Sequence, residues 1–353
     1  MAFGVVVALT TTACSDGGGS GAAGGLPLPG VDAVTTTSIA AVPSPLTGLA
    51  IPRALAQRPV VTVKVDNSPA ARPQAGLAAA DLIYEERVEG SVVRFLAVYQ
   101  STDAAPVGPV RSVRSTDAAI IAPLGGVFAF SGGIATFTER ARTTGVRLVT
   151  EDDNAGVKAR PGRKRPLATY ADTERLRLAS RTGAPPPLFA RLAPPETFAP
   201  TAREASALKV VFGSLTTAEW KWDAAQNVWL RSTNGTPHLL EGGHRVDATC
   251  VILQTVPYKA TKESDRSGFQ VDEAVITGSG RAIVGCEGRT IAARWDKPSL
   301  KAVTTWSDAE TGRPIRLTPG RTWVSLVPTT AAVTVTPKVP RVTTTAPGKL
   351  GRS

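Results

Sequence analysis

A proline-rich run at residues 184–200 divides this chain into two parts with different residue patterns. Prolines at this density favour a linker over a helix or a strand. In residues 44–200, short β-branched apolar runs alternate with stretches that carry helix signals. In residues 201–328, β-rich runs such as LKVVF, CVILQTV and TWVSLV are separated by turn residues. The sequence therefore predicts an α+β fold, with a mixed α/β domain at 44–200 followed by a mostly antiparallel β domain at 201–328.

Three strands are expected early in the first part. Residues 60–65 form a β-branched apolar run, which is typical of a buried strand. Residues 82–88 and 92–99 are expected to pair around a turn at Gly90 and Ser91. The pattern therefore predicts a hairpin beside a buried strand.

Two helices are expected after these strands. Ser115 or Thr116 can cap the first, because a side-chain hydroxyl accepts a hydrogen bond from a free backbone N–H group, and this helix is expected to run to Leu124. The second follows the turn Ser131-Gly132-Gly133 and ends near Thr144. Such a glycine turn after a strand exposes backbone N–H groups to an anion, although two glycines alone are a weak signal.

The N-terminus has the sequence pattern of an export signal. A short apolar stretch at residues 2–9 is followed by small residues and then Cys14. This is the pattern of a bacterial lipoprotein signal peptide (residues 1–14), in which the cysteine becomes the lipidated first residue. Residues 15–43 are rich in Gly, Ala, Ser, Thr and Pro, which predicts a flexible tether. The folded part is thus expected outside the cytoplasm, anchored to the outer face of the cell membrane. The alternative is a flexible start with an unmodified cysteine.

Two basic segments indicate the kind of partner. The chain has 40 Lys and Arg residues against 29 acids, a net charge of +11. Residues 329–353 contain basic residues, Thr and Pro but no acid, and we expect a disordered tail. Residues 158–165 carry five cations in eight positions. Behind a lipoprotein signal, an anionic lipid, a wall polymer or an envelope protein is a more sensible partner than nucleic acid, and a solvated loop is the alternative.

Composition and motifs exclude several classes of protein. No apolar run reaches the ~18 residues that a membrane-spanning helix needs. Two histidines and three cysteines are too few for a multi-His metalloenzyme or a Cys-rich zinc protein. The chain contains no P-loop, GxGxxG, HExxH or CxxC pattern, so we expect no metal and no cofactor. Nucleophilic catalysis needs a histidine near the nucleophile, but His238 and His244 both lie in the β part, beside a glycine pair.

A dense group of carboxylates supplies the catalytic candidates, should the protein be an enzyme. They are Asp66, Asp81, Glu85 and Glu89. Two carboxylates that flank a glycosidic bond hydrolyse it, one as the acid and the other as base or nucleophile, so a hydrolase of cell-wall glycan is one hypothesis. The alternative, which we favour, is structural ion pairing, since charges on a half-buried sheet need partners. In the expected hairpin, Arg94 lies opposite Arg87, with the glutamates diagonal to it.

Three arginines are the candidate ligand-binding residues: Arg72, Arg111 and Arg114. Arg72 precedes a proline in a turn-rich segment. Arg111 and Arg114 come just before the expected helix at Ser115, whose first turn offers unpaired N–H groups and the positive end of a dipole. Guanidinium groups grip phosphate or carboxylate bidentately, so convergence of the three predicts an anion site. The alternative is that they pair with the carboxylates named above.

The second part carries a candidate disulfide between Cys250 and Cys286. With Cys14 lipidated, these are the remaining thiols, and the outside of the cell is oxidising. The alternative is two separate cysteines, because the sequence cannot place their Cα atoms within bonding range. All six tryptophans also lie in this part, where we expect them to fill the β core more readily than to stack on sugars.

Several short motifs recur in a pattern known from one family. They include Pro45-Leu46-Thr47-Gly48, Asp66-Asn67, Ala71-Arg72-Pro73-Gln74, Val88-Glu89-Gly90, Gly108-Pro109-Val110-Arg111-Ser112 and, near the end, LTPGRTWVSLVP. In combination they resemble the YerB-like bacterial lipoproteins, a family of unknown function. The resemblance covers residues 44–328 and implies an α+β fold in two domains and an extracytoplasmic anchor, but no reaction. It departs at residues 165–170, where the family has Pro-His-Asn-Leu-Tyr, so no histidine-dependent activity of relatives is implied here.

Together these features predict a lipid-anchored protein of the cell envelope that binds an anionic envelope ligand or partner without catalysis. A carboxylate-dependent hydrolase acting on cell-wall glycan is the alternative. A scaffold that contacts other envelope proteins is a third class.

Overall fold

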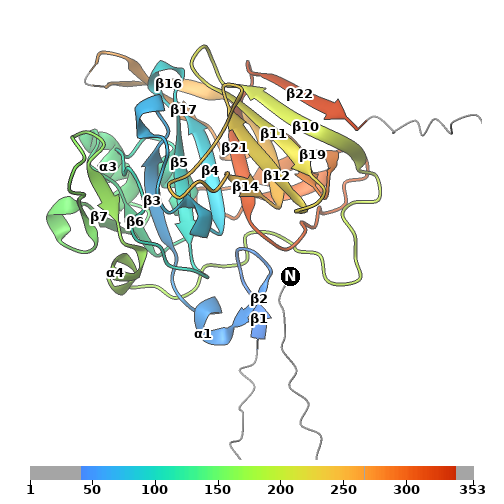
Figure 1. Ribbon diagram of the computed structural model, residues 1–353, viewed down its shortest axis with the longest axis horizontal. Coiled ribbons are helices and arrows are strands. Elements are labelled where there is room, and N and C mark those ends of the chain that lie inside the picture. The colour runs from blue at the N-terminus through green and yellow to red at the C-terminus, as the bar shows by residue number, and fades with distance from the viewer. Residues whose placement is uncertain (1–40, 266, 339–353) are drawn as a thin grey trace, which may run out of the picture. The chain divides into compact units, whose positions relative to one another are not determined.

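The computed structural model describes residues 41–265 and 267–338, and strands predominate in it (Figure 1). Sixteen strands form one large mixed sheet. Its main path runs in the order β13 (Thr236–Pro237), β12 (Val228–Thr233), β11 (Thr217–Asp223), β10 (Arg203–Val211), β19 (Arg289–Lys297), β18 (Gly278–Cys286), β15 (Cys250–Val256), β21 (Thr322–Pro328), β4 (Leu82–Arg87), β5 (Val93–Tyr99), β3 (Val61–Asp66), β6 (Val127–Ala129) and β7 (Arg147–Val149). Beside this path, β14 (Asp247–Ala248) pairs with β12, β20 (Thr305–Asp308) with β19, and β22 (Ala332–Pro337) with β10. The expected α+β class is confirmed only in part, because the protein is mostly β.

Strand β21 joins the two parts of the chain. It runs parallel to β15 on one side and to β4 on the other, and every one of its residues is buried. A near-continuous apolar run is typical of a strand that is covered on both faces. Residues 44–200 and 201–328 therefore share one sheet, and both hydrophobic clusters draw on both parts. The proline-rich linker does not separate two independent cores.

The expected hairpin is present, but its register differs by one residue. Strands β4 and β5 pair antiparallel, with Glu86 opposite Arg94, so the prediction that Arg94 faces Arg87 is wrong. The cause is the connection, in which the 3-10 turn Glu89–Ser91 holds three residues where a two-residue turn was expected. Gly90 and Ser91 both adopt positive φ, as a tight connection of this kind requires.

The helices are short: α1 (Arg53–Ala56), α2 (Asp117–Ile121), α3 (Ala135–Arg142) and α4 (Thr173–Leu178). Helix α2 lies where the first helix was expected but ends before Leu124, and neither predicted hydroxyl caps it. The Thr116 hydroxyl instead accepts a hydrogen bond from the backbone N–H of Ala274 at 2.9 Å. The Asp117 carboxylate accepts from the backbone N–H of Arg114 at 2.7 Å. Helix α3 follows the glycine turn as expected.

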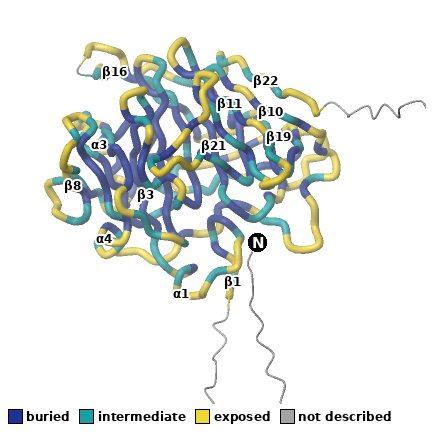
Figure 2. The backbone as a smooth tube through the Cα atoms, viewed as in Figure 1, coloured by how far each residue is buried: buried dark blue, intermediate teal, exposed yellow. Residues whose placement is uncertain are grey.

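The two faces of the sheet hold the core. Figure 2 shows the central strands of the sheet buried, whereas β22 and many connecting loops are exposed. Four tryptophans are almost fully buried, namely Trp220, Trp229, Trp295 and Trp323, and Trp306 is 8% exposed. Trp323 packs edge-on against Trp220, with ring centroids 5.1 Å apart. The prediction that the tryptophans fill the β core is therefore confirmed for these five, whereas Trp222 is only partly buried against the core.

The ends of the described chain are more ordered than the sequence predicts. The segment expected to be a disordered tail from residue 329 contains β22, which pairs with β10 and is held there by alternating Val and Thr residues. The last residues of the expected tether form β1 (Ala41–Pro43), which pairs with β2 (Ala50–Pro52). Cys14, most of the tether and residues 339–353 lie outside the described residues. Among the helices that are described, none has the length and apolar character to cross a membrane.

Candidate functional site

The four candidate carboxylates are each held by donors of the fold. Asp81 accepts hydrogen bonds from the backbone N–H groups of Gln100 (2.6 Å) and Ser101 (2.8 Å), at the end of β5. Glu85 and Glu89 accept hydrogen bonds from arginines, whereas Asp66 accepts from Ser68 and forms an ion pair with Arg111. None of the four lines the hollows described below. The structure therefore brings no two of them together across a hollow. Among residues 41–265 and 267–338, no three His, Cys, Asp or Glu side chains group as a metal-ion site.

Arg111 and Arg114 belong to an internal ion-pair cluster. Arg114 donates from Nε to Glu89 at 2.7 Å, and Arg94 contacts the same carboxylate at 3.2 Å. Burial alone would raise the pKa of Glu89, but the hydrogen bonds and charges of the two arginines outweigh it and lower this pKa to about 2. Arg111 lies 3.0 Å from Asp66. The two arginines therefore have the carboxylate partners that the alternative hypothesis gave them.

A second ionic cluster lies next to the first and was not singled out from the sequence. Lys64 is fully buried between Glu86 and Asp117, and its Nζ is 2.7 Å from Asp117 Oδ1. Burial raises the pKa of Glu86, Lys64 lowers it in part, and the charge of Asp117 raises it further. Lys64 and Glu86 occupy strands β3 and β4, on either side of β5. Their pairing depends on sheet order, which local sequence patterns do not fix.

Glu85 is bound to an arginine from the second part of the chain. Arg231 Nη2 lies 2.6 Å from Glu85 Oε1, and both side chains are fully buried. Trp323 Nε1 (3.1 Å) and Ser325 Oγ (2.8 Å) donate to the other carboxylate oxygen. The guanidinium carbon lies 5.0 Å from the Trp323 ring centroid and 5.4 Å from that of Trp220. Glu85 is thus fully engaged in holding the sheet together.

Arg72 lies apart from Arg111 and Arg114. It lines a hollow of about 640 Å³ between its own turn and the loop at residues 233–243, which we call the Arg72 hollow. Burial, followed by the charge of Arg231, lowers the pKa of Arg72. Within the described chain, no ion pair or hydrogen bond joins the Arg72 side chain to another residue. The three arginines therefore do not converge, and of these three only Arg72 lies beside a hollow without an ion-pair partner among the described residues.

His238 lies at the back of the Arg72 hollow. Its Nδ1 is 3.2 Å from Arg231 Nε and 3.0 Å from Thr233 Oγ1, and its Nε2 is 2.9 Å from Gln74 Oε1. Burial, followed by the charges of Arg231 and Arg72, lowers the pKa of His238 to about 2. The ring is therefore neutral. Because Arg231 donates to Nδ1, the ring proton lies on Nε2 and is donated to Gln74. All of its polar atoms are engaged, so it is no free base.

The basic run at residues 158–165 borders the same hollow. Arg160 Nη1 lies 2.8 Å from Glu241 Oε2, and Arg163 Nη2 lies 3.0 Å from Glu241 Oε1. Glu241 lines the Arg72 hollow, and its backbone N–H donates to the carbonyl of Gln74 at 2.9 Å. The run thus holds the loop against the Arg72 turn. The sequence offered little to find this loop beyond its paired glycines at 242–243.

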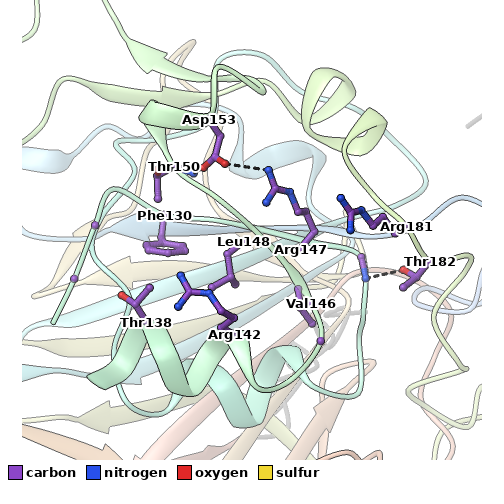
Figure 3. Close-up of a pocket in the computed structure, with 14 residues that line it drawn as sticks. Phe130, Thr138, Arg142, Val146, Arg147, Leu148, Thr150, Asp153, Arg181 and Thr182 are labelled. Atoms are coloured by element: carbon purple, nitrogen blue, oxygen red, sulfur yellow. Dashed lines mark hydrogen bonds and ion pairs between the residues drawn. The ribbon is translucent and has the colours of Figure 1, made fainter. Parts of the chain in front are cut away.

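A second arginine-lined hollow, of about 600 Å³, lies along helix α3 and edge strand β7 (Figure 3). Arg142 extends from the helix and Arg147 from the strand. The glycine turn at 132–133 also lines this hollow. Arg147 is paired with Asp153 and Arg142 with Glu139, whereas Arg181, which also lines this hollow, has no ion pair among the described residues. An anion that binds Arg142 or Arg147 would therefore compete with an existing ion pair.

The two remaining cysteines lie opposite each other. Strands β15 and β18 pair Cys250 with Cys286 in register, with Cα atoms 4.5 Å apart. The structure joins them in a disulfide. Both are fully buried in the first hydrophobic cluster. The bond therefore joins the neighbouring strands β15 and β18, and β15 in turn pairs with β21.

The matches to known protein families fall on either side of the proline-rich run at residues 184–200. Residues 46–184 match the family described as "Protein of unknown function (DUF3048) N-terminal domain", and residues 208–324 match its C-terminal domain. A Bacillus subtilis (strain 168) protein named "Putative lipoprotein YerB" is 25% identical over 306 residues, which cover 83% of this chain and 88% of that protein. The crystal structure of the YerB protein from Bacillus subtilis matches with a TM-score of 0.71 at 23% identity, covering 83% of this chain and 99% of that one. The chain therefore belongs to the YerB-like family of DUF3048 proteins.

Proposed function

We propose that this protein is a lipid-anchored envelope protein that binds an anionic envelope ligand in the Arg72 hollow without transforming it. The observation that carries the proposal is the half-buried guanidinium of Arg72, which lines a hollow and has no carboxylate partner among the described residues. The anchor rests on Cys14 and the apolar stretch before it. The name of the B. subtilis relative, a putative lipoprotein, supports the same location.

Burial and charge explain why an anion would bind there. Removing a guanidinium from water is costly unless an anion compensates for it. The lowered pKa of Arg72 records this cost, and the charge of Arg231 adds to it. A phosphate or carboxylate in the hollow would accept two parallel hydrogen bonds from Arg72. Glu241 also lines the hollow, and Arg160 and Arg163 compensate its negative charge.

The alternative function, a carboxylate-dependent hydrolase of cell-wall glycan, has less support. It requires two carboxylates on opposite sides of a bound sugar. Glu85 and Glu89 are instead bonded to buried arginines, and Asp81 accepts from two backbone N–H groups. Freeing any of them would leave a buried charge without a partner.

The test compares two arginine variants of the full chain carrying Cys14→Ser. Binding of a glycerol-phosphate polymer and of polyglutamate is measured by calorimetry at low salt. Arg72→Ala should weaken binding roughly tenfold or more, the value of a lost charge-assisted hydrogen-bond pair. Arg53→Ala, which removes an exposed arginine on α1, is the matched control and should bind as the parent does. Equal binding by Arg72→Ala and the parent would rule out this site.

A further inference from the structure

The solvent face of strands β18, β19 and β20 sets two arginines directly opposite each other. Arg281 on β18 pairs in register with Arg294 on β19, and both side chains are exposed. In the part of the chain that the structure describes, no ion pair or hydrogen bond joins either guanidinium to another residue. Like charges directly opposite each other destabilise a sheet. The sheet therefore carries a like-charge pair here that no ion pair among the described residues relieves.

A second exposed cross-strand pair in the same sheet shows the usual arrangement. Lys209 on β10 lies opposite Glu219 on β11, and the two side chains form an ion pair at 2.9 Å. Opposite charges at this spacing attract across the strands. The Arg281–Arg294 pair departs from that arrangement and leaves two cations that need an anion.

Hydroxyl groups surround the two arginines. They line a hollow of about 460 Å³ together with Ser279, Thr305 and Ser307. Ser307 on β20 lies directly opposite Arg294, on the side away from Arg281. Residues directly opposite each other have Cβ atoms about 4.5–5.5 Å apart, so both guanidiniums and the Ser307 hydroxyl can reach one small anion.

We propose that Arg281 and Arg294 form a phosphate-binding site, with the Ser307 hydroxyl as a further donor. A phosphate group has enough oxygens to accept bidentate hydrogen bonds from two guanidiniums and one more from a hydroxyl, whereas a carboxylate has only two oxygens. The site lies on β18–β20 and shares no residue with the Arg72 hollow. The proposal is therefore independent of the proposed function above.

Asp296 limits where the phosphate binds. It lies two residues from Arg294 on the same strand and lines the same hollow. Its carboxylate repels an anion, so the phosphate is held on the row formed by Arg281, Arg294 and Ser307. Removing this charge should strengthen binding without any new contact.

The binding test uses inorganic phosphate and the full chain carrying Cys14→Ser and Arg72→Ala, so that the Arg72 hollow cannot contribute. Calorimetry at low salt should detect phosphate binding in this background. Adding Arg294→Gln should weaken it roughly tenfold, and adding Asp296→Asn should strengthen it. Adding Lys209→Gln, which removes an exposed cation elsewhere, should leave it unchanged. Equal binding with and without Arg294→Gln would overturn the proposal.

A stability measurement tests the repulsion separately. In low-salt chloride buffer without phosphate, Arg294→Gln should melt above the parent, because it removes the repulsion. Lys209→Gln should melt at or below the parent, because it removes an attraction. In the background carrying Cys14→Ser and Arg72→Ala, phosphate should raise the melting temperature more than chloride of equal ionic strength does, and adding Arg294→Gln should abolish this extra effect. If that background responds equally to both salts, the result would show screening alone and would contradict the site.

The source of the phosphate group is distinguished by vesicle sedimentation. Phosphatidic acid vesicles, whose phosphomonoester keeps three unesterified oxygens, are compared with phosphatidylcholine vesicles, for the same background with and without Arg294→Gln. Arg294-dependent binding to phosphatidic acid identifies a lipid headgroup as one source. Binding of inorganic phosphate without vesicle binding identifies a soluble or polymer-borne phosphate. If neither probe depends on Arg294, the site is refuted.

Discussion

Arg231 and Glu85 form an ion pair in which neither side chain is exposed to solvent, and they are separated by 146 positions in the sequence. Arg231 comes from β12 and Glu85 from β4, so the pair spans the two family-defined parts of the chain. The Trp323 indole N–H and the Ser325 hydroxyl complete the shell of Glu85, and both belong to β21. The pair therefore couples the packing of β21 to both parts.

Removing one partner of this pair should be severely destabilising. Glu85→Ala leaves the Arg231 guanidinium buried without a counter-charge, and we expect a loss of about 3–5 kcal/mol in the free energy of unfolding. Urea denaturation followed by tryptophan fluorescence measures it. Glu219→Ala breaks the exposed pair with Lys209 and should cost no more than about 1 kcal/mol. Similar losses for the two variants would contradict the role given to the buried pair.

The buried cluster around Lys64 should make stability depend on pH. The pKa of Glu86 rises from 4.5 to about 7 on folding, so the folded chain binds a proton that the unfolded chain has already lost. The contribution of Glu86 to the free energy of unfolding is therefore most favourable below pH 4.5, and it falls as the pH rises from 4.5 through about 7. Glu86→Gln cannot ionise and should lack this fall. Urea denaturation at several pH values measures the difference in unfolding free energy between parent and variant. A difference that stays constant from pH 4.5 to 7 would exclude the effect.

Local patterns predicted many of the strands but not their neighbours. The β-branched run at 60–65 matches β3, and the two arms of the hairpin match β4 and β5, because side-chain branching and alternation act over a few residues. The insertion of β21 beside β4 depends on contacts about 240 residues apart, which no short pattern encodes. The sequence therefore indicated elements more reliably than their order in the sheet.

The candidate sites show the same limit. The arginines and carboxylates could be identified by residue type, but the single extra residue in the Glu89–Ser91 turn changed which charges face each other. Arg72 could be named from its motif, whereas the loop opposite it could not, because the fold brings it there from residues 233–243. The Arg281–Arg294 pair is visible only once the register of β18 and β19 is known.

The disulfide between β15 and β18 should contribute measurably to stability. Cys250 and Cys286 are 36 positions apart, and closing a loop of this size restricts the unfolded chain by about 3–4 kcal/mol in the chain-entropy model. The double variant Cys250→Ala and Cys286→Ala should lose about that much unfolding free energy. Thiol titration of the unfolded, unreduced chain carrying Cys14→Ser should find no free thiol. Two free thiols per chain would show that the bond does not form in the protein.

Lipid attachment at Cys14 should determine where the protein is found. In the proposed function the Cys14 thiol carries the lipid, so Cys14→Ser should remove the anchor without altering the described residues. When both forms are expressed in a bacterium that processes lipoproteins, the parent should sediment with membranes and the variant should appear in the soluble extracytoplasmic fraction. Ser15→Ala is the control, since it changes a neighbouring residue and keeps the thiol. The folded part has no described helix suited to crossing a membrane, so retention of Cys14→Ser in the membrane fraction would point to attachment through another contact.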